Sequence, residues 1–302
     1  MEFIYQQDKK ERLDKFLETK LPEITRSQIK KLILNNQVMV NGAKSTVHHW
    51  LKPNDKITYN KRSKKEKIEK IIPEPKIIAQ TENYLVIDKP HDLLVHPTDR
   101  GEKNTLVNWL LKSFPKTKKI GDDPLRPGIV HRLDKEVSGL MVIALNQKYF
   151  DLLKKQFQNR TIQKEYTALV YGRLLNETGE ITTPLERDKK TGLMKAQNVK
   201  QTGKSAHTIY EVVKKFINYT LIKIKIKTGR MHQIRAHFYS IGHSITGDRL
   251  YQTKNIRKKK KILDKRIFLH AYFLSWQDEN KKWLKYSSPL PKELKQFLTT
   301  IK

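Results

Sequence analysis

The sequence predicts an α+β protein, with a small helical module followed by a larger domain built on a large, mainly antiparallel mixed sheet. Two observations lead to this prediction. Apolar residues recur with helical spacing in the first 60 positions. From about residue 77 onward, most apolar segments are short runs or alternate with polar residues, as strands do, and only a few helical stripes lie among them.

The N-terminal module, expected at residues 1–60, begins with two short helices. The first helical stripe consists of Leu13, Phe16 and Leu17, and the second of Ile29, Leu32 and Ile33. Pro22 interrupts the first helix. Thr25, followed three residues later by Gln28, forms a capping-box pattern that begins the second helix.

Short strands complete the module. Val38 and Val40 stand at alternate positions before the tight-turn dipeptide Asn41-Gly42, which predicts a hairpin. Lys61–Lys70 has almost no apolar content and prolines follow it, so residues 61–76 are expected to form a charged, extended linker. The larger domain is expected to span residues 77–302.

In the larger domain, strands are expected at Tyr84–Ile87, Leu140–Leu145, Tyr166–Tyr171 and Ile222–Ile226. The second of these runs is wholly apolar, which predicts a fully buried strand. In the last, isoleucine alternates with lysine, which predicts a half-buried strand with a basic outer face. Helices are expected over residues 106–110 and 150–157 and after Gly229. A second basic run, Arg257–Lys261, is expected on an exposed loop, either as a solvated tip or as an RNA phosphate contact.

Charge and composition narrow the class of protein. Of 302 residues, 62 are Lys or Arg and 31 are Asp or Glu. The formal net charge of +31 points to a polyanionic partner, with nucleic acid foremost; a lysine-rich proteome with solvated charges is the alternative. The absence of cysteine excludes disulfides, thiolate zinc sites, iron–sulfur clusters and a cysteine nucleophile. The longest apolar run is far shorter than the ~20 residues that span a bilayer, and no secretory signal is recognised.

Three familiar cofactor or metal patterns are not met. Gly203-Lys204-Ser205 ends like a phosphate-binding P-loop, but Asn198 stands where that motif needs glycine. His232 and His237 are five positions apart, which does not match the His-x-x-x-His zinc spacing on a helix. There is no Gly-x-Gly-x-x-Gly motif, which weakens a Rossmann methyltransferase or dehydrogenase interpretation. Neither a cofactor nor a metal is expected.

Candidate catalytic residues are expected in the polar segments next to the predicted strands. Gly128–Leu140 is a charged loop that leads into the most apolar strand, a common way to hold a reactive group on a rigid scaffold. Within it Asp134 lies between Arg132 and Lys135, whose charges favour an ionised carboxylate; a turn or capping role is the alternative. Tyr166, taken alone, is a packed strand tyrosine. A further segment gathers polar side chains within six residues: Arg230, His232, Gln233 and Arg235.

Basic side chains gather on or beside the two N-terminal helices: Arg12, Lys15, Arg26, Lys30 and Lys31. Together with Arg12-Leu13-Asp14 and Val40-Asn41-Gly42, this ordered series resembles the RNA-binding αL module first named for ribosomal protein S-four. An unrelated basic helical hairpin is the alternative. The resemblance implies RNA contacts at Arg12, Arg26, Lys30 and Lys31.

Over about residues 80–290 the chain resembles the RluA-type family of pseudouridine synthases. The resemblance rests on motifs in order: Val86-Ile87-Asp88-Lys89-Pro90, His131-Arg132-Leu133-Asp134 with Ser138-Gly139-Leu140, Lys164 with Tyr166 and Gly172, Thr228-Gly229-Arg230 with His232-Gln233-Ile234-Arg235, Gly247-Asp248 with Tyr251, and Leu269-His270-Ala271. Val137 and Asp92 stand where the family usually has Thr and Gly. Asp tolerates the left-handed conformation that a turn at position 92 would need.

The resemblance implies an isomerase that detaches uracil from its ribose, rotates it and reattaches it through carbon 5, without redox cofactor, nucleotide or metal. It assigns Asp134 as the nucleophile, attacking either the base or the anomeric carbon, and Arg235 as its bidentate partner. It assigns Tyr166 to stack on the base and to take the proton from carbon 5. Substrate contacts are further expected from Arg132, which fills the space of the flipped uridine, from Leu269 at the pocket floor, and from Arg230, His232 and Gln233.

The expected substrate is bacterial large-subunit ribosomal RNA, modified in the cytoplasm by a monomer; transfer RNA is the alternative substrate. Two other classes of function are weighed against this one. A non-catalytic RNA-binding or ribosome-assembly protein would have no need of Asp134, Tyr166 and Arg235 together. An RNA methyltransferase would need a glycine-rich cofactor loop.

Overall fold

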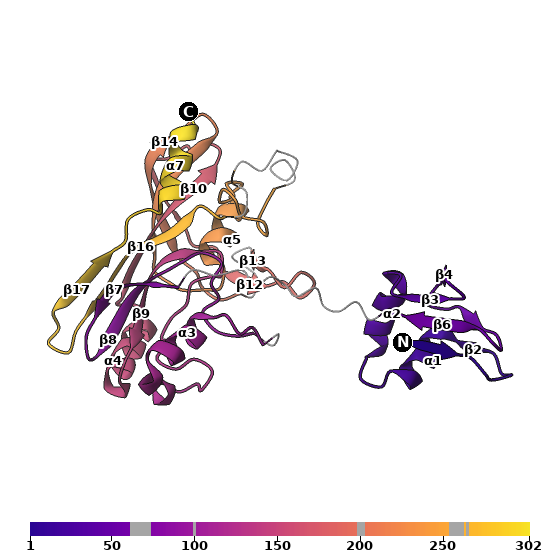
Figure 1. Cartoon of the computed structure of the whole chain (residues 1–302). Helices are drawn as coiled ribbons and strands as arrows, with labels where there is room; N and C mark the ends of the chain where they lie inside the picture. The colour runs from indigo at the N-terminus through magenta and orange to yellow at the C-terminus, as the bar shows by residue number, and fades with distance from the viewer. Residues whose placement is uncertain (61–73, 99–100, 198–202, 254–262, 264–265) are drawn as a thin grey trace. The chain divides into compact units, whose positions relative to one another are not determined.

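The computed structural model describes residues 1–60, 74–98, 101–197, 203–253, 263 and 266–302. The chain divides into two units, Met1–Ile71 and Ile72–Lys302 (Figure 1). Each unit has its own hydrophobic core. Most of the linker expected at 61–76, and the whole basic run at 257–261, lie outside the described residues. None of the helices in the described part of the chain is long and apolar enough to cross a membrane.

The N-terminal unit packs α1 (Leu13–Lys20) and α2 (Arg26–Leu34) against short antiparallel strands. These pair in the order β1 (Glu2–Ile4), β6 (Lys56–Tyr59), β3 (Val38–Val40) and β4 (Ala43–Lys44), and β2 (Glu11–Arg12) pairs with β5 (Trp50–Leu51). The N–H of Thr25 donates to Gln28 Oε1 at 2.9 Å, which confirms the capping box. Asn41 and Gly42 both have positive φ, as the predicted type I′ hairpin turn requires.

The second unit is built on a nine-stranded mixed sheet. Its strands lie in the order β11 (Thr178–Ile181), β14 (Thr208–Lys215), β15 (Tyr219–Ile226), β10 (Gln163–Tyr171), β16 (Leu269–Gln277), β9 (Ser138–Ala144), β8 (Tyr84–Lys89) and β7 (Lys76–Gln80), with β17 (Trp283–Ser287) paired to β16. Its strand pairs are antiparallel except β9 with β16. The predicted large, mainly antiparallel mixed sheet is therefore confirmed. A small hairpin of β12 (Leu185–Arg187) and β13 (Met194–Ala196) stands outside this sheet.

The described helices of this unit are α3 (Leu106–Ser113), α4 (Gln147–Gln158), α5 (Gln233–Ser240) and α7 (Lys292–Thr300), with a short 3-10 segment η1 (Pro115–Lys119). The side chains of Thr105 and Asn146 each accept a backbone N–H three residues later, which begins α3 and α4. Helix α7 was not predicted from the sequence, although its buried Leu294 and Phe297 have helical spacing.

Burial follows the apolar patterns that predicted the strands. All seven residues of β9 are buried, because this strand lies inside the sheet and side chains pack on both of its faces. In β15 the isoleucines at 222, 224 and 226 are buried, whereas Lys223 is exposed and Lys225 is partly buried. The predicted half-buried strand is confirmed.

Gly139 allows β9 to approach β16 closely. Its φ is 126°, and a Cβ at this position would lie 2.3 Å from the carbonyl oxygen of Ala271, its partner in the parallel pairing. Only glycine fits such an approach. The loop that precedes β9 is thereby brought beside the beginning of β16, where Leu269 stands.

Candidate active site

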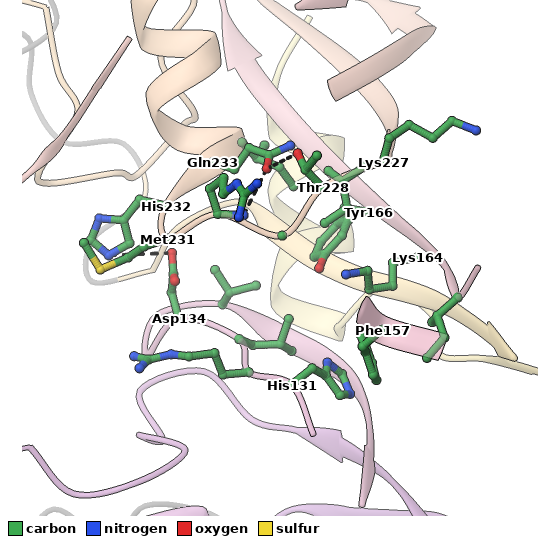
Figure 2. A pocket seen from close by; sticks show the side chains of 18 of the residues that line it. His131, Asp134, Phe157, Lys164, Tyr166, Lys227, Thr228, Met231, His232 and Gln233 are labelled. Atoms are coloured by element: carbon green, nitrogen blue, oxygen red, sulfur yellow. Dashed lines mark hydrogen bonds and ion pairs between the residues drawn. The ribbon is translucent and has the colours of Figure 1, made fainter. Parts of the chain in front are cut away.

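Asp134 lines a cavity of about 500 Å³ in the second unit. The cavity lies between the loop before β9, the end of α4 with the first part of β10, the segment from β15 into α5, and the start of β16. Figure 2 shows Asp134, Tyr166 and His232 around this space, each from a different element. All the site residues predicted for the larger domain line it: Arg132, Asp134, Tyr166, Arg230, His232, Gln233, Arg235 and Leu269.

Arg235, on α5, is the direct partner of Asp134. Its side chain is only 2% exposed, and its Nη1 donates to Asp134 Oδ2 at 3.1 Å. Glu136 Oε2 lies 3.5 Å from the same nitrogen. Burial disfavours the charged guanidinium, but the hydrogen bonds and charge of Asp248, with the charges of Asp134 and Glu136, raise the pKa of Arg235 above its ordinary value. The Asp134 carboxylate therefore faces a permanently charged donor.

The bidentate partner of Arg235 is Asp248, not Asp134 as the sequence predicted. Nε and Nη2 of Arg235 donate to Asp248 Oδ2 and Oδ1 at 2.6 and 2.9 Å. Asp248 Oδ1 also accepts the backbone N–H groups of Leu250 and Tyr251 at 2.9 and 3.1 Å. Asp248 is buried and rigidly held in this turn, so it accepts the paired hydrogen bonds from Nε and Nη2 of Arg235. Nη1 is left to donate to Asp134.

His232 stands immediately before α5 in a left-handed conformation, with φ 50°. This conformation is uncommon for a residue with a side chain, and such residues cluster at functional sites. His232 Nε2 lies 3.9 Å from Asp134 Oδ2, and Nδ1 lies 3.0 Å from the Tyr251 hydroxyl. Burial lowers the pKa of His232, so a neutral imidazole lies beside the carboxylate at neutral pH. Among the described residues, no group of three or more His, Cys, Asp or Glu side chains could hold a metal ion.

The sequence predicted that Gln233 contacts the substrate. In the structure its side-chain amide instead hydrogen-bonds to the protein and supports the site. Its Oε1 accepts from Thr228 Oγ1 at 2.7 Å and from the N–H of Arg230 at 3.0 Å. Its Nε2 donates to the carbonyl of His207 and to Thr208 Oγ1, both at 3.0 Å. An amide side chain can make four hydrogen bonds, and the protein uses all four to shape the turn between β15 and α5.

Tyr166 and Leu269 form neighbouring walls of the cavity on paired strands. In the register of β10 and β16, Tyr166 lies opposite Ala271 and Ala168 lies opposite Leu269. Burial, and then the charge of Asp134, raise the pKa of Tyr166 well above its usual value, so the phenol keeps its proton at neutral pH. Leu269 is buried and presents apolar surface.

Arg132 is held by His96 and not by the carboxylate beside it in the sequence. Its Nη1 lies 3.0 Å from His96 Nε2. Burial, then the positive charges of Arg132 and Arg126, lower the pKa of His96 to about 4, so the imidazole is neutral and accepts this hydrogen bond. Arg230, on the other side of the cavity, donates from Nε to the carbonyl of Ser205 at 2.9 Å.

Lys89 fixes the base of the loop that carries Asp134. This lysine is fully buried, and its Nζ donates to the carbonyl oxygens of Pro90, Leu93 and Lys135 at 2.9, 2.9 and 3.2 Å. Burial lowers the pKa of Lys89 to about 7. Asp92 has φ 64°, the left-handed conformation expected where the family has glycine. Val137 packs into the core, and its N–H donates to the carbonyl of Asp134 at 3.1 Å, so the loop keeps its turn.

In the N-terminal unit, two of the four predicted RNA contacts are arginines that share a buried carboxylate. Arg12 donates to Asp14 through Nε and Nη2, both at 2.9 Å, and Arg26 Nη2 lies 3.1 Å from Asp14 Oδ2. Burial disfavours the Asp14 carboxylate, but the two arginines hold its pKa below the ordinary value. Lys30 and Lys31 are exposed on α2.

Several residues that shape the site were not predicted to do so. Asp248, Tyr251 and Lys89 belong to the motifs that carry the family resemblance, and His96 follows the first of these motifs, but nothing local to them shows which group each would contact. Asp248 follows a glycine in a turn-like segment, which by itself predicts only a turn. Its contact with Arg235 depends on how that turn folds back onto α5.

Comparison with known proteins identifies the family. The model of RNA pseudouridylate synthase matches residues 83–240, and that of the S4 domain matches residues 11–57. An uncharacterized RNA pseudouridine synthase of Aquifex aeolicus (strain VF5) is 38% identical, over 96% of this chain and 94% of the relative. Ribosomal large subunit pseudouridine synthase D of Blochmanniella floridana is 35% identical, also over 96% and 94%.

A solved structure shows the same fold. Human RNA Pseudouridylate Synthase Domain Containing 1 superposes with a TM-score of 0.59 at 22% identity, covering 76% of this chain and 95% of the human chain. The residues that line the cavity lie within the matched region, except Leu269. This chain therefore belongs to the RNA pseudouridylate synthase family, the isomerases that convert uridine to pseudouridine in RNA.

Proposed function

We propose that this enzyme acts on bacterial large-subunit ribosomal RNA and that Asp134 is its nucleophile. The observation that carries the assignment is the Asp134 carboxylate, which lines the cavity with Arg235 Nη1 at 3.1 Å and Tyr166 on a neighbouring wall. The choice of RNA is supported by relatives named ribosomal large subunit pseudouridine synthase D in Blochmanniella, Neisseria and Buchnera. A ribosomal substrate implies that the enzyme works in the cytoplasm.

The proposed reaction begins with attack by Asp134 on the base or on the anomeric carbon. The bond between N1 and the anomeric carbon breaks, the uracil rotates, and carbon 5 forms the new bond to that carbon. The hydrogen of carbon 5 leaves as a proton, N1 ends protonated, and Asp134 departs with the electron pair that it supplied. Arg235, held by Asp248, keeps the carboxylate aligned while these bonds change.

Tyr166 is proposed to stack on the uracil, with Leu269 below it. Because burial keeps the phenol protonated, its oxygen can take the proton from carbon 5 only if its own proton moves to another acceptor. Asp134 is the one acid that lines the cavity in the described part of the chain. After its release from the sugar or base, Asp134 can take that proton and pass it on to N1, so N1 ends protonated and the carboxylate is regenerated.

A uridine in folded RNA must leave its stack to reach Asp134, at a cost of a few kcal/mol. Arg132 lies at the cavity and is proposed to occupy the space that the base leaves. The contacts that offset this cost are assigned to the N-terminal module and to the positive surface of the chain, which bind phosphates without regard to sequence. One chain is proposed to act alone.

The first test is release of tritium from RNA transcribed with uridine labelled at carbon 5, because that hydrogen must leave when carbon 5 becomes the glycosidic atom. We expect wild type to release tritium from unmodified large-subunit ribosomal RNA, and Asp134→Asn to bind the same RNA without release. Comparable residual turnover by Asp134→Asn would contradict its assignment as nucleophile.

Two other outcomes would change the proposed substrate or the proposed class of function. Release from transfer RNA but not from ribosomal RNA would keep the reaction and change the substrate. Tight RNA binding with no release from either would favour a non-catalytic role in ribosome assembly.

A further inference from the structure

Lys164 is a positive charge in the active-site cavity for which the proposed reaction gives no role. Its ammonium group makes no hydrogen bond or ion pair with any described residue. Nζ lies over the ring of Phe157, 5.2 Å from the ring centroid. Burial lowers the pKa of Lys164 to about 8, so the group is still mostly charged at neutral pH. A half-buried cation that has no partner among the described residues and lines a substrate cavity is suited to bind an anion from outside the protein.

Packing fixes the position of this lysine. Phe157 stacks on His131 with ring centroids 4.7 Å apart, and His131 Nε2 accepts the N–H of Val142 at 3.1 Å. Burial, and then the charge of Lys164, lower the pKa of His131 to about 3, so this imidazole is neutral. Figure 2 shows His131, Phe157 and Lys164 along one side of the cavity.

The opposite side of the ammonium group is left open by a glycine. A Cβ on Gly229 would already touch Lys164 Nζ at 3.5 Å, so a longer side chain there would cover the charge. Gly229 belongs to the segment between β15 and α5 that lines the cavity. Glycine at this position therefore keeps Nζ accessible to a ligand.

The surroundings of Lys164 favour an anion. Arg160 and Lys227 line the same cavity, and their side chains make no ion pair with any described residue. The one carboxylate on the cavity wall, within the described residues, is Asp134, and Arg235 binds it. A concave site with several cations and a single, already paired carboxylate concentrates negative ligands.

The order of groups along the cavity indicates which anion. Lys164 and Tyr166 are two residues apart on β10, so their side chains share a face of the sheet and stand about 7 Å apart. The charge of Asp134 acts on Tyr166, whereas burial alone accounts for the shift at Lys164. With the uracil between Asp134 and Tyr166, the next charged part of the same nucleotide is its backbone phosphate, one ribose away.

We infer that Lys164 binds a phosphodiester oxygen of the flipped nucleotide and so positions the RNA backbone. This inference rests on the proposed function. The contact has a clear use during the reaction, because the ribose is detached from the uracil while the base turns. A charge-assisted hydrogen bond from Lys164 to the phosphate keeps the anomeric carbon in line with Asp134 and with carbon 5.

The test uses a synthetic RNA stem-loop around the uridine mapped by tritium release. Either phosphate next to that uridine is replaced by a neutral methylphosphonate. Binding is compared among Asp134→Asn, Asp134→Asn with Lys164→Met, and Asp134→Asn with Lys295→Met. Lys295 is the matched control, because it is exposed on α7 and does not line the cavity.

At one of the two phosphates, we expect methylphosphonate to weaken binding by Asp134→Asn and by the Lys295 control roughly tenfold. The Lys164→Met protein is expected to bind native and neutral RNA equally. Its slope of log Kd against log salt for native RNA is expected to be smaller by about 0.7, the loss of one phosphate contact.

Equal losses in all three proteins at both phosphates would overturn the inference, as would a Lys164→Met protein that binds like the control. If Lys164→Met lowers the unfolding temperature, Lys164→Gln is measured in its place, and Lys164→Arg is expected to keep the coupling. Wild-type turnover of the same stem-loop is measured in parallel. Absence of tritium release would refute the proposed function, whereas release without coupling would refute only the role of Lys164.

Discussion

Arg235 positions the Asp134 carboxylate, and Asp248 in turn positions Arg235. The Arg235 guanidinium donates two hydrogen bonds to Asp248, at 2.6 and 2.9 Å, and one to Asp134, at 3.1 Å. Asp248 is itself fixed by two backbone N–H groups of its own turn. A residue that does not touch the substrate thus sets the geometry of the proposed nucleophile.

Asp248→Asn is expected to lower kcat about 100-fold while leaving RNA binding nearly unchanged, because a small displacement of Arg235 misaligns Asp134. The same change removes one charge of a buried pair and is expected to destabilise the second unit by about 3 kcal/mol. Tritium release under saturating RNA, together with urea unfolding, measures both effects.

Glu136→Gln is the matched control for this prediction. Glu136 also lies near Arg235, at 3.5 Å, but its side chain is 41% exposed. We expect this variant to keep kcat within a few-fold of wild type, since exposed ion pairs contribute little. Wild-type kcat in Asp248→Asn, or an equal loss in Glu136→Gln, would contradict the positioning role.

At the scale of the elements, the site depends on the parallel pairing of two strands of the sheet. β9 and β16 pair at Ser138 with His270 and at Gly139 with Ala271. The pair is tied further by Ser138 Oγ, which lies 2.8 Å from His270 Nδ1. This junction carries the Asp134 loop on one strand and Leu269 on the other, so its spacing sets the width of the cavity between them.

Gly139→Ala is expected to destabilise the second unit by about 3 kcal/mol or more, because the new Cβ would meet the Ala271 carbonyl at 2.3 Å and force the strands apart. Gly242→Ala is the control, since Gly242 also has positive φ but has nothing within 4 Å of a Cβ; a loss of about 1 kcal/mol is expected there. Urea unfolding of the full chain, with hydrogen exchange at β9 and β16, compares the two. Equal losses would show that backbone conformation alone, and not the close approach, explains the need for glycine at position 139.

At the scale of the whole molecule, the two units are proposed to divide the roles of RNA binding and catalysis. Each has its own core, and the residues that line the cavity all belong to the second unit. The S4 domain match lies entirely in the first. Affinity for a large folded RNA can therefore be altered without touching the reacting groups.

Deletion of residues 1–60 is expected to weaken binding to large-subunit ribosomal RNA by more than tenfold and to reduce its salt dependence, because phosphate contacts are lost. Turnover of a short stem-loop at saturating concentration is expected to stay within a few-fold of wild type. Filter binding at two salt concentrations and tritium release measure the two effects. Equal binding by the truncated and full-length chains would refute this division of roles.

Local features of the chain were predictable from the sequence. The capping box at Thr25, the Asn41-Gly42 turn and the buried run of β9 are encoded by residues within a few positions of one another. The Asp92 turn is of the same kind, since a left-handed residue is needed there and Asp tolerates it. Helix α7 was missed because its apolar stripe is short and gains its stability from packing, not from its own pattern.

By itself the sequence determined many of the elements, the family and the identity of the predicted site residues that meet in the cavity, since periodicity, turn chemistry and ordered motifs are written along the chain. Only the tertiary structure decided how those residues pair. Asp134 and Arg235 are 101 positions apart in the sequence. Asp248 accepts the paired hydrogen bonds of the Arg235 guanidinium because its turn folds back onto α5. The hydrogen bonds that occupy Gln233 are likewise set by which segments pack together, and so is the lack of an ion-pair partner for Lys164 within the described part of the chain. Packing between distant segments has no local signature in a sequence.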